Sequence, residues 1–232
     1  MSIFITQPTI GQKELTHYYL EINGTDSHNF EYKIGVITYN EYFKPKKTIL
    51  KDLTTFDHLV EKINSSLRKE NTSDILNIFI HGIWSNKNSV WKRVVQNISK
   101  DIYTTGDQKE KVILSIIWDS SINYIKGVKI ARRKGRYLAP FLTNILATKN
   151  QEIKINFLCH SMGNRIFQHM IVESELLKNK KHIIDQYIAV GGDLQHDIFE
   201  KDEPLFGIDK VVSEITIFVH NNDRSLKMSK ND

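Results

Sequence analysis

Ser161, in the second half of the chain, lies in a sequence pattern that can position a nucleophile. Residues 155–158 form a short apolar run, Ser161 follows it, and a helical pattern begins directly afterwards. Small residues lie two places to either side, Cys159 before the serine and Gly163 after it. A sharp strand-to-helix turn needs small residues there, because larger side chains would collide where the backbone folds back. The pattern is typical of a nucleophile elbow, which presents a serine hydroxyl for attack on a carbonyl carbon.

Two backbone N–H groups are candidates for stabilising the oxyanion of such a reaction. That of Met162 lies at the start of the helix after the serine, where the helix dipole is positive. The other belongs to Ile83, in the run His81-Gly82-Ile83-Trp84 that follows a buried strand. The glycine of this run lets the backbone approach a ligand. We expect Trp84 to contact substrate, and His81 either to do the same or to brace the loop from beneath.

The elements that must position these residues alternate along the chain from about residue 50. Alternation of strands and helices predicts right-handed crossovers and a mostly parallel sheet covered on both faces. In such a sheet the functional residues lie at the carboxyl ends of the strands. Asp193 and Asp223 each follow a predicted strand and are therefore candidates. Residues 14–43 predict an antiparallel edge pair. The predicted strands are 74–80, 112–118, 153–158, 187–190 and 214–219, and the predicted helices are 56–67, 91–98, most of 122–148, and one around 166–171.

Composition places the chain among ordinary globular proteins. Its 232 residues, 40% hydrophobic and 25% charged, fit one α/β domain. Cys159 is the only cysteine, so no intrachain disulfide can form, and we expect a cytoplasmic location without a secretion signal. The histidines and acids show no metal-ligand spacing, and phosphate-loop and dinucleotide fingerprints are absent from the sequence. We therefore expect no cofactor, no metal and no nucleic-acid partner, while the oligomeric state stays open.

A basic cluster lies in the segment 122–148. Such clusters usually lie on a solvated surface, and the net charge of +5 is mild. Lys126, Lys129, Arg133 and Arg136 nevertheless share one side of the expected helix. The alternative is that this side contacts an anionic headgroup or surface.

Several separated motifs resemble the α/β-hydrolase superfamily, closest to an uncharacterised bacterial branch with a His-Ser-Met-Gly-Asn-Arg elbow. The resemblance implies an α/β-hydrolase-like three-layer sandwich with an antiparallel N-terminal edge. It implies a single domain over 1–232, with edge strands in 1–50 and a catalytic core in 74–232. The motifs run from about Ile75 to the end: His81-Gly82, Trp118, His160 to Arg165, Asp193 to Phe199, and Asn222-Asp223-Arg224 with Leu226.

The resemblance also implies roles for individual residues. Ser161 is the nucleophile, Ile83 and Met162 are the oxyanion donors, Asp223 is the triad acid, and Asp193 is a reserve acid. The implied activity is hydrolysis of a small-molecule or lipid carboxylic ester. The alternative is a degenerate, non-catalytic hydrolase fold that binds a partner or an anionic lipid surface.

One part of the superfamily pattern is missing. Its triad histidine follows the strand after the acid, and the sequence ends nine residues past Asp223 without such a strand. Three alternatives stay open: the final strand lies on a longer chain, another histidine substitutes, or the chemistry is lost. The substitutes are His196, in a loop that can lean over the site, and His220, at the end of the acid strand.

Overall fold

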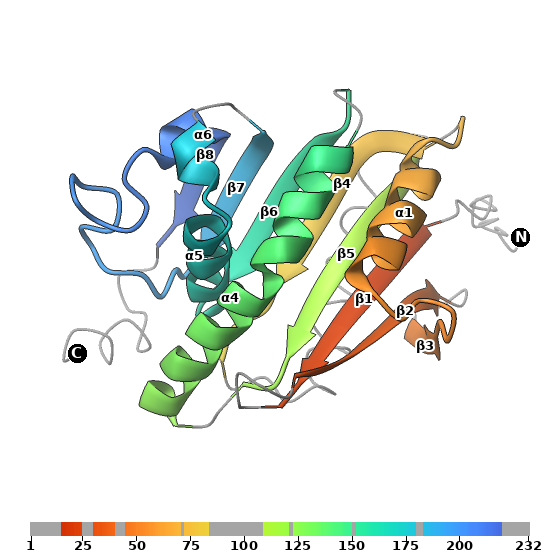
Figure 1. The fold of residues 1–232 in the computed structure, drawn as a ribbon, viewed down its shortest axis with the longest axis horizontal. Coiled ribbons are helices and arrows are strands. Elements are labelled where there is room, and N and C mark those ends of the chain that lie inside the picture. Colours follow the sequence, from red (N-terminus) through yellow and green to blue (C-terminus); the bar gives the residue numbers. More distant parts are fainter. Residues whose placement is uncertain are drawn as a thin grey trace, which may run out of the picture.

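The computed structural model describes residues 15–24, 30–39, 45–70, 72–83, 109–120, 123–149, 152–179 and 183–219. These residues form an eight-stranded sheet of order β3-β2-β1-β5-β4-β6-β7-β8, with helices packed against it (Figure 1). In chain order the elements are β1 (Leu15–Asn23), β2 (Glu31–Tyr39), β3 (Pro45–Ile49), α1 (Phe56–Leu67), β4 (Thr72–Ile80), β5 (Glu110–Trp118), α4 (Tyr124–Thr148), β6 (Lys154–His160), α5 (Gly163–Glu173), α6 (Leu176–Asn179), β7 (Ile184–Val190), a 3-10 turn (Ile208–Lys210) and β8 (Val212–Phe218).

Helices α1 and α4 begin at polar residues that cap their free N–H groups. The Thr55 side chain accepts a hydrogen bond from the His58 N–H at the start of α1, and the Asn123 side chain accepts one from the Lys126 N–H at the start of α4. Each helix then turns an apolar stripe towards the sheet. Figure 1 shows α1, α4 and α5 in front of the sheet, with α4 crossing it obliquely.

The central strands are parallel and buried, as the sequence predicts. β5, β4, β6, β7 and β8 pair in parallel, in registers that align their carboxyl ends along one edge. Ile80 pairs with Cys159, His160 with Val190, and Val190 with Phe218. Residues that directly follow β4, β6 and β7 therefore meet at this edge.

The N-terminal strands differ in one respect from the prediction. β1 and β2 are antiparallel, as expected, but β1 also pairs in parallel with β5, so it lies inside the sheet. At this end of the sheet the edge strand is β3, which lies within the predicted range of 1–50 but beyond the predicted pair of 14–43. The physical reason is visible in β1, where Tyr18, Tyr19 and Leu20 are all buried, as in a strand covered on both faces.

Two further points bear on the architecture. The helix predicted over 91–98 lies outside the described residues. Across the described ranges, no helix is long and apolar enough to cross a membrane.

Candidate active site

Ser161 lies in a strained turn between β6 and α5. Its φ of 49° is in the left-handed region, which residues with a side chain rarely occupy. Hydrogen bonds hold this backbone in place. The Ser161 N–H donates to the Val190 carbonyl over 2.9 Å, and the Ser161 carbonyl accepts from the Asn164 N–H at 3.0 Å and from the Asp193 N–H at 3.3 Å. The backbone at Ser161 therefore makes the sharp strand-to-helix turn that the sequence predicts.

Two glycines permit the close approach of the surrounding backbone. A Cβ at Gly163 would lie 2.4 Å from the Ile80 carbonyl oxygen, and one at Gly82 would lie 2.6 Å from the Ser161 Cβ. Any side chain at either position would push β4 or its loop away from Ser161. Cys159, two residues before the serine, is fully buried, and burial raises the pKa of its thiol. It is a small packing residue rather than a second nucleophile.

The two predicted oxyanion donors lie together beneath α4. A Cβ at Gly127 would lie 2.7 Å from Ile83 Cδ1 and 3.0 Å from Met162 Sδ, so both side chains pack against the same helical turn. The hydrogen bonds between described backbone groups include none donated by the Ile83 or Met162 N–H. Neither N–H group is used elsewhere by the described backbone, which is a necessary condition for the predicted oxyanion role.

His81 supports the loop that carries Ile83. It is buried, and its ring stacks on Trp118 with centroids 5.5 Å apart. Its Nε2 accepts from the Trp118 backbone N–H at 3.0 Å, so the ring proton is on Nδ1, which donates to the Gly82 carbonyl at 2.7 Å. Burial lowers its pKa to about 4. Of the two alternatives for His81, this geometry corresponds to bracing the loop, and Trp84 lies outside the described residues.

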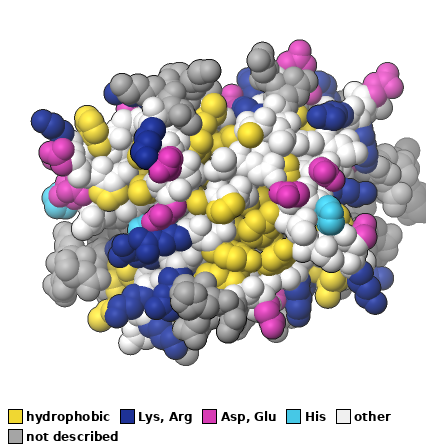
Figure 2. Space-filling view, viewed as in Figure 1, with side chains coloured by type: hydrophobic (Ala, Val, Ile, Leu, Met, Phe, Trp, Pro, Cys, Tyr) yellow, Lys and Arg dark blue, Asp and Glu magenta, His cyan; other side chains and the backbone are white. Residues whose placement is uncertain are grey.

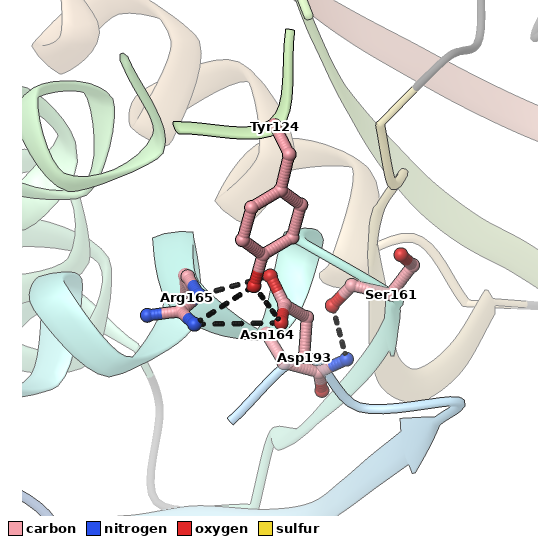
Figure 3. Close-up of polar contacts among 5 residues, drawn as sticks. All are labelled: Tyr124, Ser161, Asn164, Arg165 and Asp193. Atoms are coloured by element: carbon pink, nitrogen blue, oxygen red, sulfur yellow. Dashed lines mark hydrogen bonds and ion pairs between the residues drawn. The ribbon is translucent and has the colours of Figure 1, made fainter. Parts of the chain in front are cut away.

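Asp193 follows β7 and belongs to a buried polar cluster (Figure 3). Its carboxylate accepts from the Tyr124 hydroxyl at 2.7 Å and from Arg165 Nε at 2.9 Å. Arg165 also donates to the Tyr124 hydroxyl, at 3.1 Å. Burial, with Asp193 next in effect, raises the pKa of Tyr124 to about 12. The structure brings Asp193 to Ser161 through its backbone, while its side chain faces Arg165 on α5.

The other predicted acid and base residues are not brought to Ser161 by the described chain. His196 has a side chain 96% exposed, and its Nδ1 lies 4.0 Å from an Asp197 carboxylate oxygen. Asp223 and His220 lie outside the described residues. Within the described ranges no hydrogen bond joins a histidine to the Ser161 hydroxyl, and no group of three His, Cys, Asp or Glu residues is arranged to hold a metal. Both the acid and the base of the proposed triad stay predictions.

Asn164 and Tyr187 contribute to the site but were not predicted. The Asn164 side-chain amide donates to the Ser161 carbonyl at 2.8 Å and to the Cys159 carbonyl at 3.2 Å, and its Oδ1 accepts from the Tyr187 hydroxyl at 2.8 Å. Figure 3 shows Asn164 bonded to Ser161. The sequence signal that could have identified Asn164 is a polar residue directly after Gly163, on the buried face of α5.

Residues 56–231 match the family described as "Alpha/beta hydrolase of unknown function (DUF900)". Among solved structures, a Trichoderma reesei cutinase in complex with a C11Y4 phosphonate inhibitor is similar with a TM-score of 0.38 and 10% identity, over 74% of this chain and 76% of that one. The comparison with curated proteins found no match.

Proposed function

The chain belongs to the α/β-hydrolase family DUF900, and from this premise we propose that it is a serine hydrolase that cleaves carboxylic esters. The observation that carries the proposal is the backbone of Ser161, held at a φ of 49° between a parallel strand and a helix. This turn points a hydroxyl out of the carboxyl edge of the sheet, with two N–H donors beside it. A serine with only a structural role has no need of that strain.

The proposed reaction uses these groups in two stages. The Ser161 hydroxyl attacks the ester carbonyl carbon while a base removes its proton, and the Ile83 and Met162 N–H groups stabilise the oxyanion. Collapse of this intermediate expels the alcohol, which takes up the proton, and leaves an acyl group on the serine. Water then attacks the acyl-enzyme by the same route and releases the carboxylate.

The proton-transfer part of the proposal rests on the superfamily pattern. A histidine acts as the base, and Asp223 orients it, with Asp193 as the reserve acid. Asp193 is less suited to that role, because Arg165 and Tyr124 already occupy both of its carboxylate oxygens. We also propose a cytoplasmic location, on the ground of the single cysteine.

A serine-reactive fluorophosphonate probe tests the proposal directly. We expect the folded wild type to be labelled and to hydrolyse short p-nitrophenyl esters, and Ser161→Ala to lose labelling and about 10³-fold or more of the turnover. Ser174→Ala is the matched control, because Ser174 lies at the far end of α5 and its hydroxyl bonds only to the Ile171 carbonyl. Equal rates in wild type and Ser161→Ala would remove the proposal.

A binding protein with a degenerate hydrolase fold is the second candidate. The observation that favours it is that His196, the candidate base among the described residues, has a side chain 96% exposed, with its Nδ1 4.0 Å from an Asp197 carboxylate oxygen. Failure of the folded wild type to react with the probe would support this candidate.

A further inference from the structure

Helix α4 has an unusual distribution of charge. Its 25 residues contain six basic side chains and no acidic one. All six lie in the first half of the helix: Lys126, Lys129, Arg132, Arg133, Lys134 and Arg136. Figure 2 shows Lys and Arg side chains gathered at the lower left, where α4 begins in Figure 1.

This arrangement opposes the stability of the helix itself. Cations in the first turn lie at the positive end of the helix dipole, and α4 has no acidic residue there to compensate. Lys126, Lys129 and Arg132 are spaced three residues apart, so each like charge faces the next along the helix surface. A sequence that breaks local rules in this way is expected at a functional surface.

Some of these basic side chains already have partners within the protein, and others are exposed to solvent. Lys134 is fully buried, and its Nζ donates to the Ile22 carbonyl at 2.9 Å. Arg136 bonds to Glu173 over 2.6 Å. Lys126, Lys129 and Arg132 are exposed, and within the described ranges they form no ion pair. From the predicted set of Lys126, Lys129, Arg133 and Arg136, the two lysines join Arg132 on this exposed surface, and Glu173 offsets the charge of Arg136.

A partly buried histidine lies beside this surface. His169 on α5 lies against α4, because a Cβ at Gly135 would be 2.5 Å from the His169 Cβ. Burial lowers the pKa of His169 to about 4, and the charges of Arg132 and Arg136 add to this effect. Glu173 acts in the opposite direction but does not cancel them.

The basic surface also carries an apolar side chain and adjoins the nucleophile. Ile125, in the first turn of α4, is 58% exposed. Its neighbour Tyr124 bonds to Asp193, and Gly127 in the same turn contacts Ile83 and Met162. The exposed lysines therefore begin within one helical turn of the predicted oxyanion donors.

We propose that the first three turns of α4 dock on an anionic lipid bilayer through Ile125, Lys126, Lys129 and Arg132, and that the hydrolase takes its ester from that surface. The second clause rests on the proposed function, whereas the docking does not. Cations spread over several turns match a field of headgroups rather than one substrate phosphate or carboxylate. An exposed isoleucine among them can insert between acyl chains and has no counterpart in a nucleic-acid backbone.

Vesicle co-sedimentation tests the docking. We expect binding to vesicles of phosphatidylcholine with phosphatidylglycerol, none to phosphatidylcholine alone, and release by high salt. A lysine near such a surface contributes about fivefold in affinity, so Lys126→Gln/Lys129→Gln should bind roughly 25-fold more weakly. Ile125→Ser should also weaken binding, whereas Ile49→Ser should not, because Ile49 is equally exposed but lies on the far edge strand β3.

The matched charge control is Lys154→Gln/Lys210→Gln. Both lysines are exposed and lie at the amino-terminal ends of β6 and β8, on the opposite edge of the sheet. An equal loss of binding in both double variants, or no vesicle binding by the wild type, would overturn the proposal. Preferential binding to single-stranded DNA that depends on Lys126 and Lys129 would replace it with a nucleic-acid surface.

The probe separates this proposal from the proposed function. We expect Ser161→Ala to bind vesicles as the wild type does, and Lys126→Gln/Lys129→Gln to keep full fluorophosphonate labelling in solution. Vesicle binding without any labelling of the wild type would refute the hydrolase and leave the docking in place. Circular dichroism melting checks that each variant is folded.

Discussion

Replacing Asp193 with asparagine removes the carboxylate charge that faces Arg165 in a site nearly closed to solvent. The two side chains are 4% and 17% exposed, and Nε and Oδ2 are 2.9 Å apart. Removing one partner of a buried pair costs about 3–5 kcal/mol, because the other charge is left without compensation. The arginine keeps some contact with water, so we expect a loss near the lower end, about 3 kcal/mol of unfolding free energy.

Urea denaturation of a double-mutant cycle measures this interaction. Arg165→Gln alone should be destabilising too, while adding Asp193→Asn to it should cost much less than in the wild type. A coupling energy above about 1.5 kcal/mol would establish the pair as a tether between the loop after β7 and the nucleophile helix. Tyr124→Phe should cost about 1.5–3 kcal/mol, since it removes a donor to the Asp193 carboxylate and an acceptor for Arg165.

Two results would refute this reasoning. A change within about 0.5 kcal/mol for Asp193→Asn would show that the cluster does not stabilise the fold. Unchanged stability together with a fall in probe labelling of about 10⁴-fold would instead identify Asp193 as the triad acid. If the pair acts as a tether, Asp193→Asn should instead lower the unfolding free energy, and its probe labelling should recover under conditions that stabilise the fold.

Three further outcomes are expected. Gly163→Ala should unfold the elbow and lose probe labelling, while Gly192→Ala should behave as wild type, because a Cβ there would meet its nearest atom only at 3.7 Å. Burial lowers the pKa of His17 to about 3 and that of His81 to about 4. As the pH falls below 6.5, these two histidines therefore take up protons in the unfolded chain while they stay neutral in the folded one. Unfolding free energy should then fall by about 1.4 kcal/mol per pH unit for each histidine between pH 6.5 and 4, and a slope unaltered in His17→Gln would count against this. Tyr187→Phe leaves a buried amide oxygen without its donor, so thermal melting should show a loss of about 1–3 kcal/mol and labelling should slow.

The parts of the fold that depend on local pattern could be predicted from the sequence. Apolar periodicity located the parallel strands, and the elbow is a five-residue feature with its own steric rule. The place of β1 could not be read in this way, because its partner β5 lies about a hundred residues away, as in the pairing of His17 with Ile113. Periodicity shows which faces of a strand are buried, but it does not identify the neighbouring strand.

The same distinction holds for the site. Ser161 and Gly163 follow from spacing along the chain, whereas the contact of Asn164 with Tyr187 joins two elements and has no local signature. The reserve-acid prediction for Asp193 illustrates the limit, since the sequence gives its position after a strand but not that Arg165 occupies its carboxylate.

The left-handed backbone of Ser161 has a consequence for directed evolution of this protein. A residue with a side chain at that φ stores about 1–2 kcal/mol of strain, which glycine would release. A library selected for thermal tolerance alone should therefore enrich glycine at position 161, and each such variant would gain stability by losing the proposed nucleophile. Selection for robustness in this chain has to be coupled to a screen for the reactive hydroxyl, because the two properties compete at one residue.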